Sequence, residues 1–206
     1  MPTLRQQFFA WMLKKGDEIN DKLYRDIKKE LFNDIRGTVV EIGPGTGINF
    51  RYLPRNIEWI GIEPNEAFHE STLNAARKQI VKSNMLNSSA ENILLPEETA
   101  DIVISTLVLC SVPDQKKVIA ETKRILKKNG RLIFIEHVAD RKKTFRRTAQ
   151  DILNPLNRFI ADGCNCNRET WKEIEQAGFT SCQIHHTIMK GAMLLHAPHI
   201  MGYTIK

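Results

Sequence analysis

The sequence has no long apolar run. Its longest, Phe8–Leu13, is followed at once by Lys14 and Lys15, whereas a helix that crosses a bilayer needs about 20 mostly apolar residues. No small-residue cleavage site follows the run, so it does not have the pattern of a secretory signal peptide. We therefore expect neither a membrane-spanning segment nor a secreted protein.

Cysteine, glycine and proline are also scarce. The 11 glycines and 8 prolines among 206 residues exclude a collagen-like or low-complexity chain. Four cysteines without a secretory signal indicate free thiols in a reducing compartment, so we expect a cytoplasmic protein. Cys164 and Cys166 are separated by one residue, which is not a zinc-ligand spacing, and the sequence therefore predicts no metal site.

A strong charge imbalance is missing as well. The 30 Lys and Arg residues against 24 Asp and Glu leave a net charge of +6, and five of the basic residues fall between Arg141 and Arg147. Such a cluster can contact nucleic acid, or it can be a solvated helix start. No base-flipping aromatic motif accompanies it, so we favour the solvated helix start and a small-molecule partner.

What the sequence does contain is an alternation of apolar, β-branched runs with amphipathic segments. Near-continuous apolar runs are typical of strands in a parallel sheet covered on both faces. Strands are expected at 38–42, 57–62, 101–110, 131–136, 182–188 and 200–205, and helices at 4–13, 19–36, 66–78, 115–128, 144–160 and 168–177. Asn129-Gly130 is expected to close the helix before it, and Pro155 to kink or interrupt its helix. This order predicts a doubly wound, Rossmann-like α/β fold with helices on both faces of the sheet.

The length fits one domain, residues 1–206. We expect 1–36 to form an N-terminal helical cap, 38–137 a cofactor-binding core, and 140–206 the acceptor-pocket cover and closing strands. The apolar first helix has two interpretations, a cap over the core or substrate mouth, and a foot that makes weak peripheral contact with a membrane. The helix at 144–160 is either an apolar lid over the acceptor or ordinary packing on the sheet.

A glycine-rich turn, Gly43-Pro44-Gly45-Thr46-Gly47, follows the first expected strand. Its glycines allow a sharp turn and a close approach of a ligand to the backbone. Glu63 ends the next strand, at the place where an acidic residue of a doubly wound fold accepts hydrogen bonds from ribose hydroxyls. Strand, glycine turn, strand and acid in this order predict a nucleoside-binding half-fold.

The charges near the turn favour S-adenosylmethionine (SAM) over NAD. A dinucleotide fingerprint has a glycine at its sixth position, where this sequence has Ile48. Glu41 precedes the turn, and its carboxylate would repel a pyrophosphate but suits the ammonium and sulfonium groups of SAM. Ala90-Glu91 is expected beside the adenine, and Thr106-Leu107 beside the methionine portion.

Glu41-Ile42-Gly43-Pro44-Gly45-Thr46-Gly47 resembles the first motif of class I SAM-dependent methyltransferases. Later stretches resemble a narrower group, the vertebrate microsomal alkyl-thiol methyltransferases of the methyltransferase-like seven family. These stretches are Gly45–Phe50, Glu63–Asn65, Thr106–Val112, Glu136–Ala139, Asp162–Asn165, Arg168–Lys172 and Pro198–Gly202. The resemblance implies a mostly parallel sheet with an antiparallel C-terminal strand. With the turn, it predicts cofactor contacts from Glu41, Gly43, Pro44, Gly45, Thr46, Gly47, Asn49, Glu63, Pro64, Asn65, Ala90, Glu91, Thr106 and Leu107.

The sequence also departs from that family. Glu63 stands where the family has Asp, Pro44 replaces its usual Cys, and the family's apolar N-terminal membrane anchor has no counterpart in the sequence. The resemblance implies methyl transfer to a small, apolar acceptor, with a thiol favoured. The alternatives are an oxygen, nitrogen or carbon of a quinone or lipid, a nucleic acid, and SAM or NAD binding without methyl transfer.

A thiol acceptor needs only modest activation, because a thiol pKa of about 8.5 is close to neutrality. His137 directly follows a strand and Asp162 precedes Gly163, so these two are the predicted bases, with His199 as a further candidate. Each also has a structural interpretation, as a strand-end residue, a cap and a loop anchor respectively.

Overall fold

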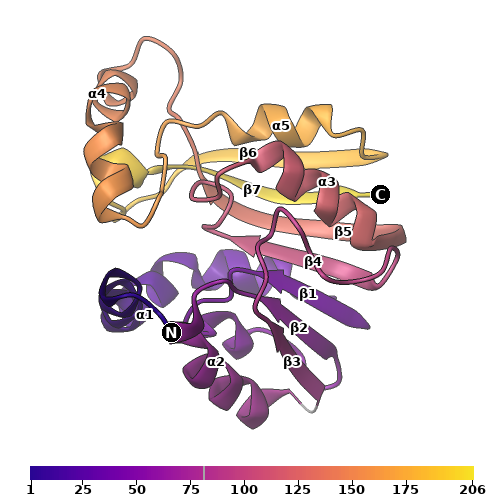
Figure 1. Cartoon of the computed structure of the whole chain (residues 1–206). Coiled ribbons are helices and arrows are strands. Elements are labelled where there is room, and N and C mark those ends of the chain that lie inside the picture. The colour runs from indigo at the N-terminus through magenta and orange to yellow at the C-terminus, as the bar shows by residue number, and fades with distance from the viewer. Residues whose placement is uncertain (81) are drawn as a thin grey trace.

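The computed structural model describes residues 1–80 and 82–206. Within them, seven strands form one sheet in the order β3-β2-β1-β4-β5-β7-β6 (Figure 1). The strands are β1 (Thr38–Ile42), β2 (Glu58–Ile62), β3 (Lys82–Leu86), β4 (Ala100–Thr106), β5 (Leu126–His137), β6 (Ser181–Ile188) and β7 (Pro198–Ile205). β1 to β5 are parallel, and β7 pairs antiparallel with both β5 and β6. The predicted fold class, with its antiparallel C-terminal strand, is confirmed.

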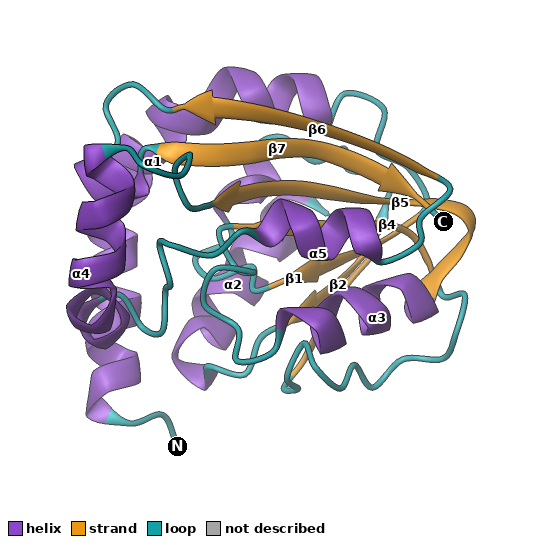
Figure 2. Cartoon of the chain, turned by 90° about the horizontal axis from the view of Figure 1, so that it is seen from above, coloured by secondary structure: helices purple, strands orange, loops and turns teal. Residues whose placement is uncertain are grey.

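Helices cover both faces of the sheet, with α3 and α5 on one face and α1 and α2 on the other (Figure 2). The helices are α1 (Leu4–Leu31), α2 (Glu66–Gln79), α3 (Gln115–Ile125), α4 (Phe145–Ile160) and α5 (Thr170–Gln176), with short 3-10 turns η1 (Ile48–Arg51) and η2 (Leu194–His196). α1 and α4 lie at the same end of the sheet (Figures 1 and 2).

The core has two layers because successive strand residues point to opposite faces. In β1, Val40 packs in the cluster that contains Val118 of α3 and Ile174 of α5. Its neighbour Val39 packs in the cluster on the opposite face, which contains Trp59 of β2 and Ala76 of α2. Both faces of β1 are therefore dry, as the continuous apolar run of this strand predicts.

The expectation of two N-terminal helices was wrong. A single helix, α1, continues through Lys14 and Lys15, and it begins with a capping box between Thr3 and Gln6. A Cβ added at Gly16 would meet nothing closer than the Asn20 side-chain nitrogen at 3.5 Å, so no close packing requires a glycine at this position. One glycine costs only about 1 kcal/mol in a helix, which a helix of 28 residues tolerates.

Several predicted boundaries were also wrong. The short strand β3 was missed, because Lys82-Ser83-Asn84 does not look apolar. α3 ends at Ile125 and β5 begins at Leu126, so Asn129, at φ 64°, lies within the strand instead of closing a helix. β4 ends at Thr106, short of the expected residue 110. α4 continues through Pro155 without interruption.

In the part of the chain that the structure describes, no helix is both long enough and apolar enough to span a membrane. This agrees with the interrupted apolar run near the N-terminus.

Candidate active site

A cavity of about 600 Å³ opens at the carboxyl ends of β1, β2, β4 and β5, beneath α1. β1 lies between β2 and β4 in the sheet, so the strand order reverses direction at β1. Doubly wound sheets bind ligands at such a switch point, and the cavity lies there. The predicted site residues in its wall are Gly43, Pro44, Gly45, Thr46, Asn49, Glu63, Pro64, Asn65, Ala90, Glu91, Thr106, Leu107, His137 and Asp162.

The glycine turn forms the floor of this cavity. Gly43 and Gly45 have φ values of 58° and 52°, which favour glycine. A Cβ at Gly43 would lie 2.7 Å from Val108, whereas one at Gly45 would have no atom within 4 Å. Gly43 therefore lets the loop pack tightly, and Gly45 leaves its backbone open to a ligand.

Glu63 lies beside this turn at the end of β2. Its side chain accepts hydrogen bonds from the backbone N–H groups of Gly45 (3.3 Å) and Asn65 (2.9 Å). The residue is 7% exposed, and burial raises the pKa of its carboxyl. Asn65 in turn caps α2 by accepting from the Ala67 N–H at 3.0 Å. The turn, the acid and the helix start are thus held as one unit, with unused carboxylate lone pairs at the cavity.

Glu41 and Gly47 are not in the cavity wall. The Glu41 carboxylate is buried and accepts from Asn49 Nδ2 (2.7 Å) and Trp59 Nε1 (2.8 Å). The Asn49 amide nitrogen also donates to the Thr106 hydroxyl at 3.2 Å, while its Oδ1 finds no partner among the described residues. Glu41 therefore orients Asn49, which lines the cavity in its place.

The two predicted bases line the same cavity in different surroundings. His137 ends β5, with its Nδ1 3.8 Å from the sulfurs of both Cys110 and Cys164. Asp162 follows α4 and forms an ion pair with Arg5 at 3.5 Å. The third candidate, His199, is not in the wall. It is buried, and its Nε2 lies 2.8 Å from the Tyr24 hydroxyl.

Sequence reasoning missed the two cysteines beside His137. A hydrogen bond from the Cys110 thiol lowers the pKa of Cys164, and His137 and His196 act in the same direction. The same pairing, with burial, raises the pKa of Cys110. The signal in the sequence was that both residues fall within stretches that resemble the methyltransferase family, Thr106–Val112 and Asp162–Asn165.

α1 also lines the cavity, in line with the interpretation of the N-terminal helix as a cap over the substrate mouth. One face of this helix forms a wall of the cavity, from residues Gln6, Phe9, Met12, Leu13, Asp17, Asn20, Tyr24 and Lys28. Lys28 is 1% exposed, and burial lowers the pKa of its ammonium group to about 8. Asp17 accepts a hydrogen bond from the Thr46 hydroxyl at 2.8 Å, which ties α1 to the glycine turn.

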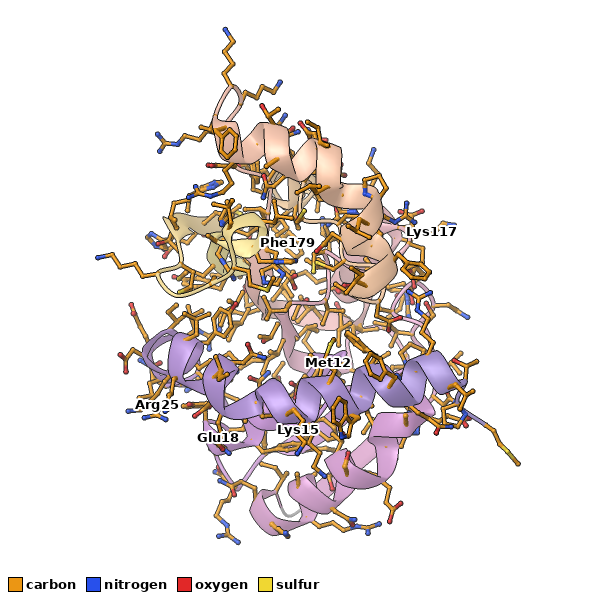
Figure 3. All side chains as sticks on the ribbon, turned by 90° about the vertical axis from the view of Figure 1, so that its left-hand side faces the viewer. Met12, Lys15, Glu18, Arg25, Lys117 and Phe179 are labelled. Atoms are coloured by element: carbon orange, nitrogen blue, oxygen red, sulfur yellow. The ribbon has the colours of Figure 1, made fainter. Side chains whose placement is uncertain are left out.

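α4 does not cover the cavity, contrary to one of the two interpretations of this segment. Its apolar side chains Ile152, Leu156 and Phe159 are exposed and are absent from the cavity wall. In Figure 3, α1 runs across this end of the molecule with α4 beyond it, and Met12 lies on the side of α1 that faces α4.

Comparisons with known proteins identify the family of this chain. Residues 40–134 match a family described as "Methyltransferase domain". Rat thiol S-methyltransferase TMT1B is 35% identical over 97% of this chain and 86% of its own length. Human thiol S-methyltransferase TMT1A is 30% identical over 98% of this chain and 87% of its own.

Solved structures show the same fold. A SAM-dependent methyltransferase of Thermotoga maritima, described as a possible histamine N-methyltransferase, has a TM-score of 0.68 at 20% identity and covers 98% of each chain. The [4+2]-cyclase SpnF has a TM-score of 0.69 at 16% identity, covering 92% of this chain and 80% of its own. A fold shared with a cyclase does not fix the chemistry, but the identity to the thiol S-methyltransferases over nearly the whole chain does fix the family. The chain belongs to the class I methyltransferase family that includes TMT1A and TMT1B.

Proposed function

We propose that this enzyme transfers a methyl group from SAM to the sulfur of a small, apolar thiol. The observation that carries the proposal is one cavity with two unlike parts. Gly45 and Glu63 suit a nucleoside, whereas Met12, Leu13 and Cys110 give the same cavity an apolar wall. The relatives named thiol S-methyltransferase support a sulfur acceptor.

The chain's own residues fit SAM, which supplies an electrophilic methyl group on a sulfonium. Glu63 would accept hydrogen bonds from the ribose hydroxyls, because its carboxylate faces the cavity beside the open backbone of Gly45. Asn49 and Thr106 line the cavity and would border the methionine portion, and the buried cation of Lys28 suits its carboxylate. Ala90 and Glu91 would border the adenine.

The acceptor thiol reacts as its thiolate, so the residues near it have to receive one proton and exclude water. His137 suits this role better than Asp162. The imidazole has no carboxylate partner in the structure described, whereas Asp162 is paired with Arg5. The main task of the protein is then to hold the sulfur in line with the methyl group.

Product analysis with methyl-labelled SAM tests the proposal. We expect methylation of apolar thiols, and His137→Gln should lower kcat/KM roughly 100-fold at pH 7, with less effect at high pH where the thiol ionises unaided. His186→Gln is the matched control, because His186 is an exposed histidine on β6. Phenols, quinols, amines and tRNA are tested as alternative methyl acceptors. Methylation of one of these with no thiol product would overturn the thiol assignment.

An exposed apolar surface supports weak contact with a membrane. Leu4, Phe8 and Trp11 of α1 are exposed, as are Ile152, Leu156 and Phe159 of α4. The two helices meet where the Arg5 guanidinium donates to the Phe159 carbonyl at 3.3 Å. We call these six residues the α1–α4 surface. The flanking cations Lys14, Lys15 and Arg158 complement an anionic lipid surface. An interfacial helix binds a bilayer both by burying apolar side chains and by attraction to anionic lipids.

We therefore propose that the enzyme is cytoplasmic and rests peripherally on anionic bilayers. Its four free cysteines support a reducing compartment. Co-sedimentation with phosphatidylglycerol-containing vesicles should exceed that with pure phosphatidylcholine vesicles, and Phe159→Asp should reduce it roughly tenfold. Leu94→Asp is the control, because Leu94 is 65% exposed and outside the α1–α4 surface. Equal sedimentation of all three proteins would contradict the contact.

A further inference from the structure

Three metal-binding side chains meet at the acceptor end of the cavity, and the proposed methyl transfer does not require them all. Cys110 lies in the loop after β4, His137 ends β5, and Cys164 follows α4. Their two sulfurs and one ring nitrogen all lie within 4.8 Å of one another. Each sulfur is 3.8 Å from His137 Nδ1. These residues are far apart in the sequence, which is why ligand spacing alone predicted no metal site.

The distances are long for hydrogen bonds and are also compatible with a metal geometry. Zinc bonds of about 2.3 Å to sulfur and 2.0–2.1 Å to nitrogen, at tetrahedral angles, place sulfur and nitrogen about 3.6 Å apart. The 3.8 Å separations differ from this value by about 0.2 Å. Small side-chain rotations would therefore bring all three atoms onto one ion.

The backbone already holds the ligands together. The Asn165 N–H donates to the Cys110 carbonyl at 2.8 Å, and the Asn157 side chain donates to the Cys164 carbonyl at 2.7 Å. A Cβ at Gly163 would lie 3.0 Å from the Ser111 carbonyl oxygen. The two cysteine loops thus touch through a glycine with φ 93°, a conformation that other residues rarely adopt. A preformed site of this kind lowers the ordering cost of binding an ion.

The two cysteines of the cluster are buried but border the cavity. Cys110 and Cys164 are 1% and 5% exposed, yet both line the cavity together with His137 and His196. Two thiolates and one imidazole leave one of four tetrahedral positions unfilled, which is the arrangement of catalytic Cys2His zinc sites. Because all three residues line the cavity, a ligand in the cavity could fill that position.

We propose that Cys110, His137 and Cys164 bind one Zn²⁺ ion whose fourth position takes the sulfur of the acceptor thiol. Only the identity of this fourth ligand depends on the proposed function. On coordination the acceptor releases its proton to solvent, so in the zinc-bound enzyme His137 is a metal ligand and takes the place of the base role proposed above. Its sulfur then forms the new bond to the methyl carbon, while the methyl–sulfonium bond breaks and its electron pair stays on S-adenosylhomocysteine (SAH). The product is a neutral thioether, a poorer zinc ligand than a thiolate, and it leaves.

Metal analysis of the full chain tests the site without any thiol or SAM present. The protein, purified under reducing conditions and treated with a chelator, is titrated with Zn²⁺ and dialysed, and bound metal is measured by mass spectrometry. We expect about one ion per chain in the wild type and nearly none in Cys164→Ser or His137→Gln. Cys166→Ser and Cys182→Ser remove cysteines outside the cluster and should bind like the wild type.

Cobalt substitution gives a second, spectroscopic readout. Co²⁺ in the wild type should show thiolate-to-metal charge transfer and the visible bands of a tetrahedral site, and Cys164→Ser should lose both. SAH titration by calorimetry checks that each variant is folded. A wild type that binds no stoichiometric zinc, or a Cys164→Ser variant that binds it equally well, would overturn the metal site. Zinc binding without any thiol methylation would leave the site standing and refute the proposed function instead.

Discussion

Glu63 is the residue whose chemistry is most closely tied to cofactor binding. Its carboxylate is buried at the carboxyl end of β2, and two backbone N–H groups fix its orientation. The sequence could predict it, because the acid stands at a fixed distance from the glycine turn and both belong to local motifs. Hydrogen bonds to a charged acceptor contribute about 1.5–3 kcal/mol each, so loss of the charge should be measurable.

We expect Glu63→Gln to weaken SAH binding roughly 10- to 100-fold in calorimetry at pH 7.5. Burial raises the pKa of Glu63, so wild-type affinity should fall on acidification, starting at a higher pH than an ordinary glutamate would give. The variant should lack this pH dependence. Glu58→Gln, at the other end of the same strand, serves as control. Unchanged affinity in Glu63→Gln would refute the ribose role.

Lys28 is a residue that the sequence could not identify as part of the site. A lysine on an amphipathic helix is usually solvated, but the fold buries this one between the rings of Tyr24 and Tyr52, at 5.9 and 5.7 Å. Burial lowers its pKa from 10.5 to about 8. Because the folded state disfavours the charged form, the ammonium group destabilises the fold below pH 8, and this penalty fades as the pH rises toward 10.5.

Lys28→Met should therefore raise the free energy of unfolding by about 3 kcal/mol at pH 7, at about 1.4 kcal/mol per pKa unit. At pH 9.5 the gain should shrink by about half. Urea denaturation at both pH values measures it, with exposed Lys29→Met as control. The same variant should bind SAH more weakly, because it removes the cation from the cavity wall. A variant that is destabilised at pH 7 would contradict this description of Lys28.

At the scale of elements, α1 shows how one helix can serve two environments. Its cavity-facing residues recur at spacings of three and four, but they mix apolar side chains such as Leu13 with polar ones such as Asn20. The opposite side includes exposed Phe8 and Ile19. Hydrophobic periodicity predicts which face of a helix is buried only when that face is apolar. This is why the sequence could suggest a helical cap over the substrate mouth but not which residues of α1 line the cavity.

Leu13→Ala tests whether α1 selects an apolar acceptor. Removing about three carbons from the wall should raise KM for an apolar thiol roughly tenfold, while the dissociation constant for SAH stays within about twofold. The control is Ile19→Ala on the same helix, where the side chain is 72% exposed. Steady-state kinetics with a short and a long alkyl thiol measure the change in acceptor KM, and SAH titration measures any change in cofactor binding. Equal KM changes in both variants would contradict a role of Leu13 in acceptor binding.

The central elements were predictable for a different reason than the edge elements. β1 and β4 are buried on both faces and read as apolar runs, such as Ile102-Val103-Ile104. β3 is an edge strand whose residues are exposed or half-buried, so its sequence shows no such run. Helix ends depended on tertiary contacts, as where β5 takes over at Leu126 directly after α3. Edges and boundaries are decided by packing that local patterns do not contain.

At the scale of the whole molecule, the sheet order places unrelated segments around one point. The glycine turn after β1, the loop after β4, the end of β5 and the segment after α4 all reach the same cavity. Motif spacing could predict the first of these, since its residues are neighbours in the chain. The meeting of Cys110, His137 and Cys164 follows only from the topology. The net charge of +6 has little part in this, because the groups that define the site are buried.

Methyl transfer to a thiol sulfur is tested most directly by competition between a thiol and its oxygen analogue. Equal concentrations of thiophenol and phenol are incubated with the enzyme and methyl-labelled SAM, and both products are quantified by mass spectrometry. We expect the labelled thioether as the main product, in equal amount to SAH, and its loss in Glu63→Gln at limiting SAM. A labelled ether in excess, or SAM consumption with no thioether, would contradict it.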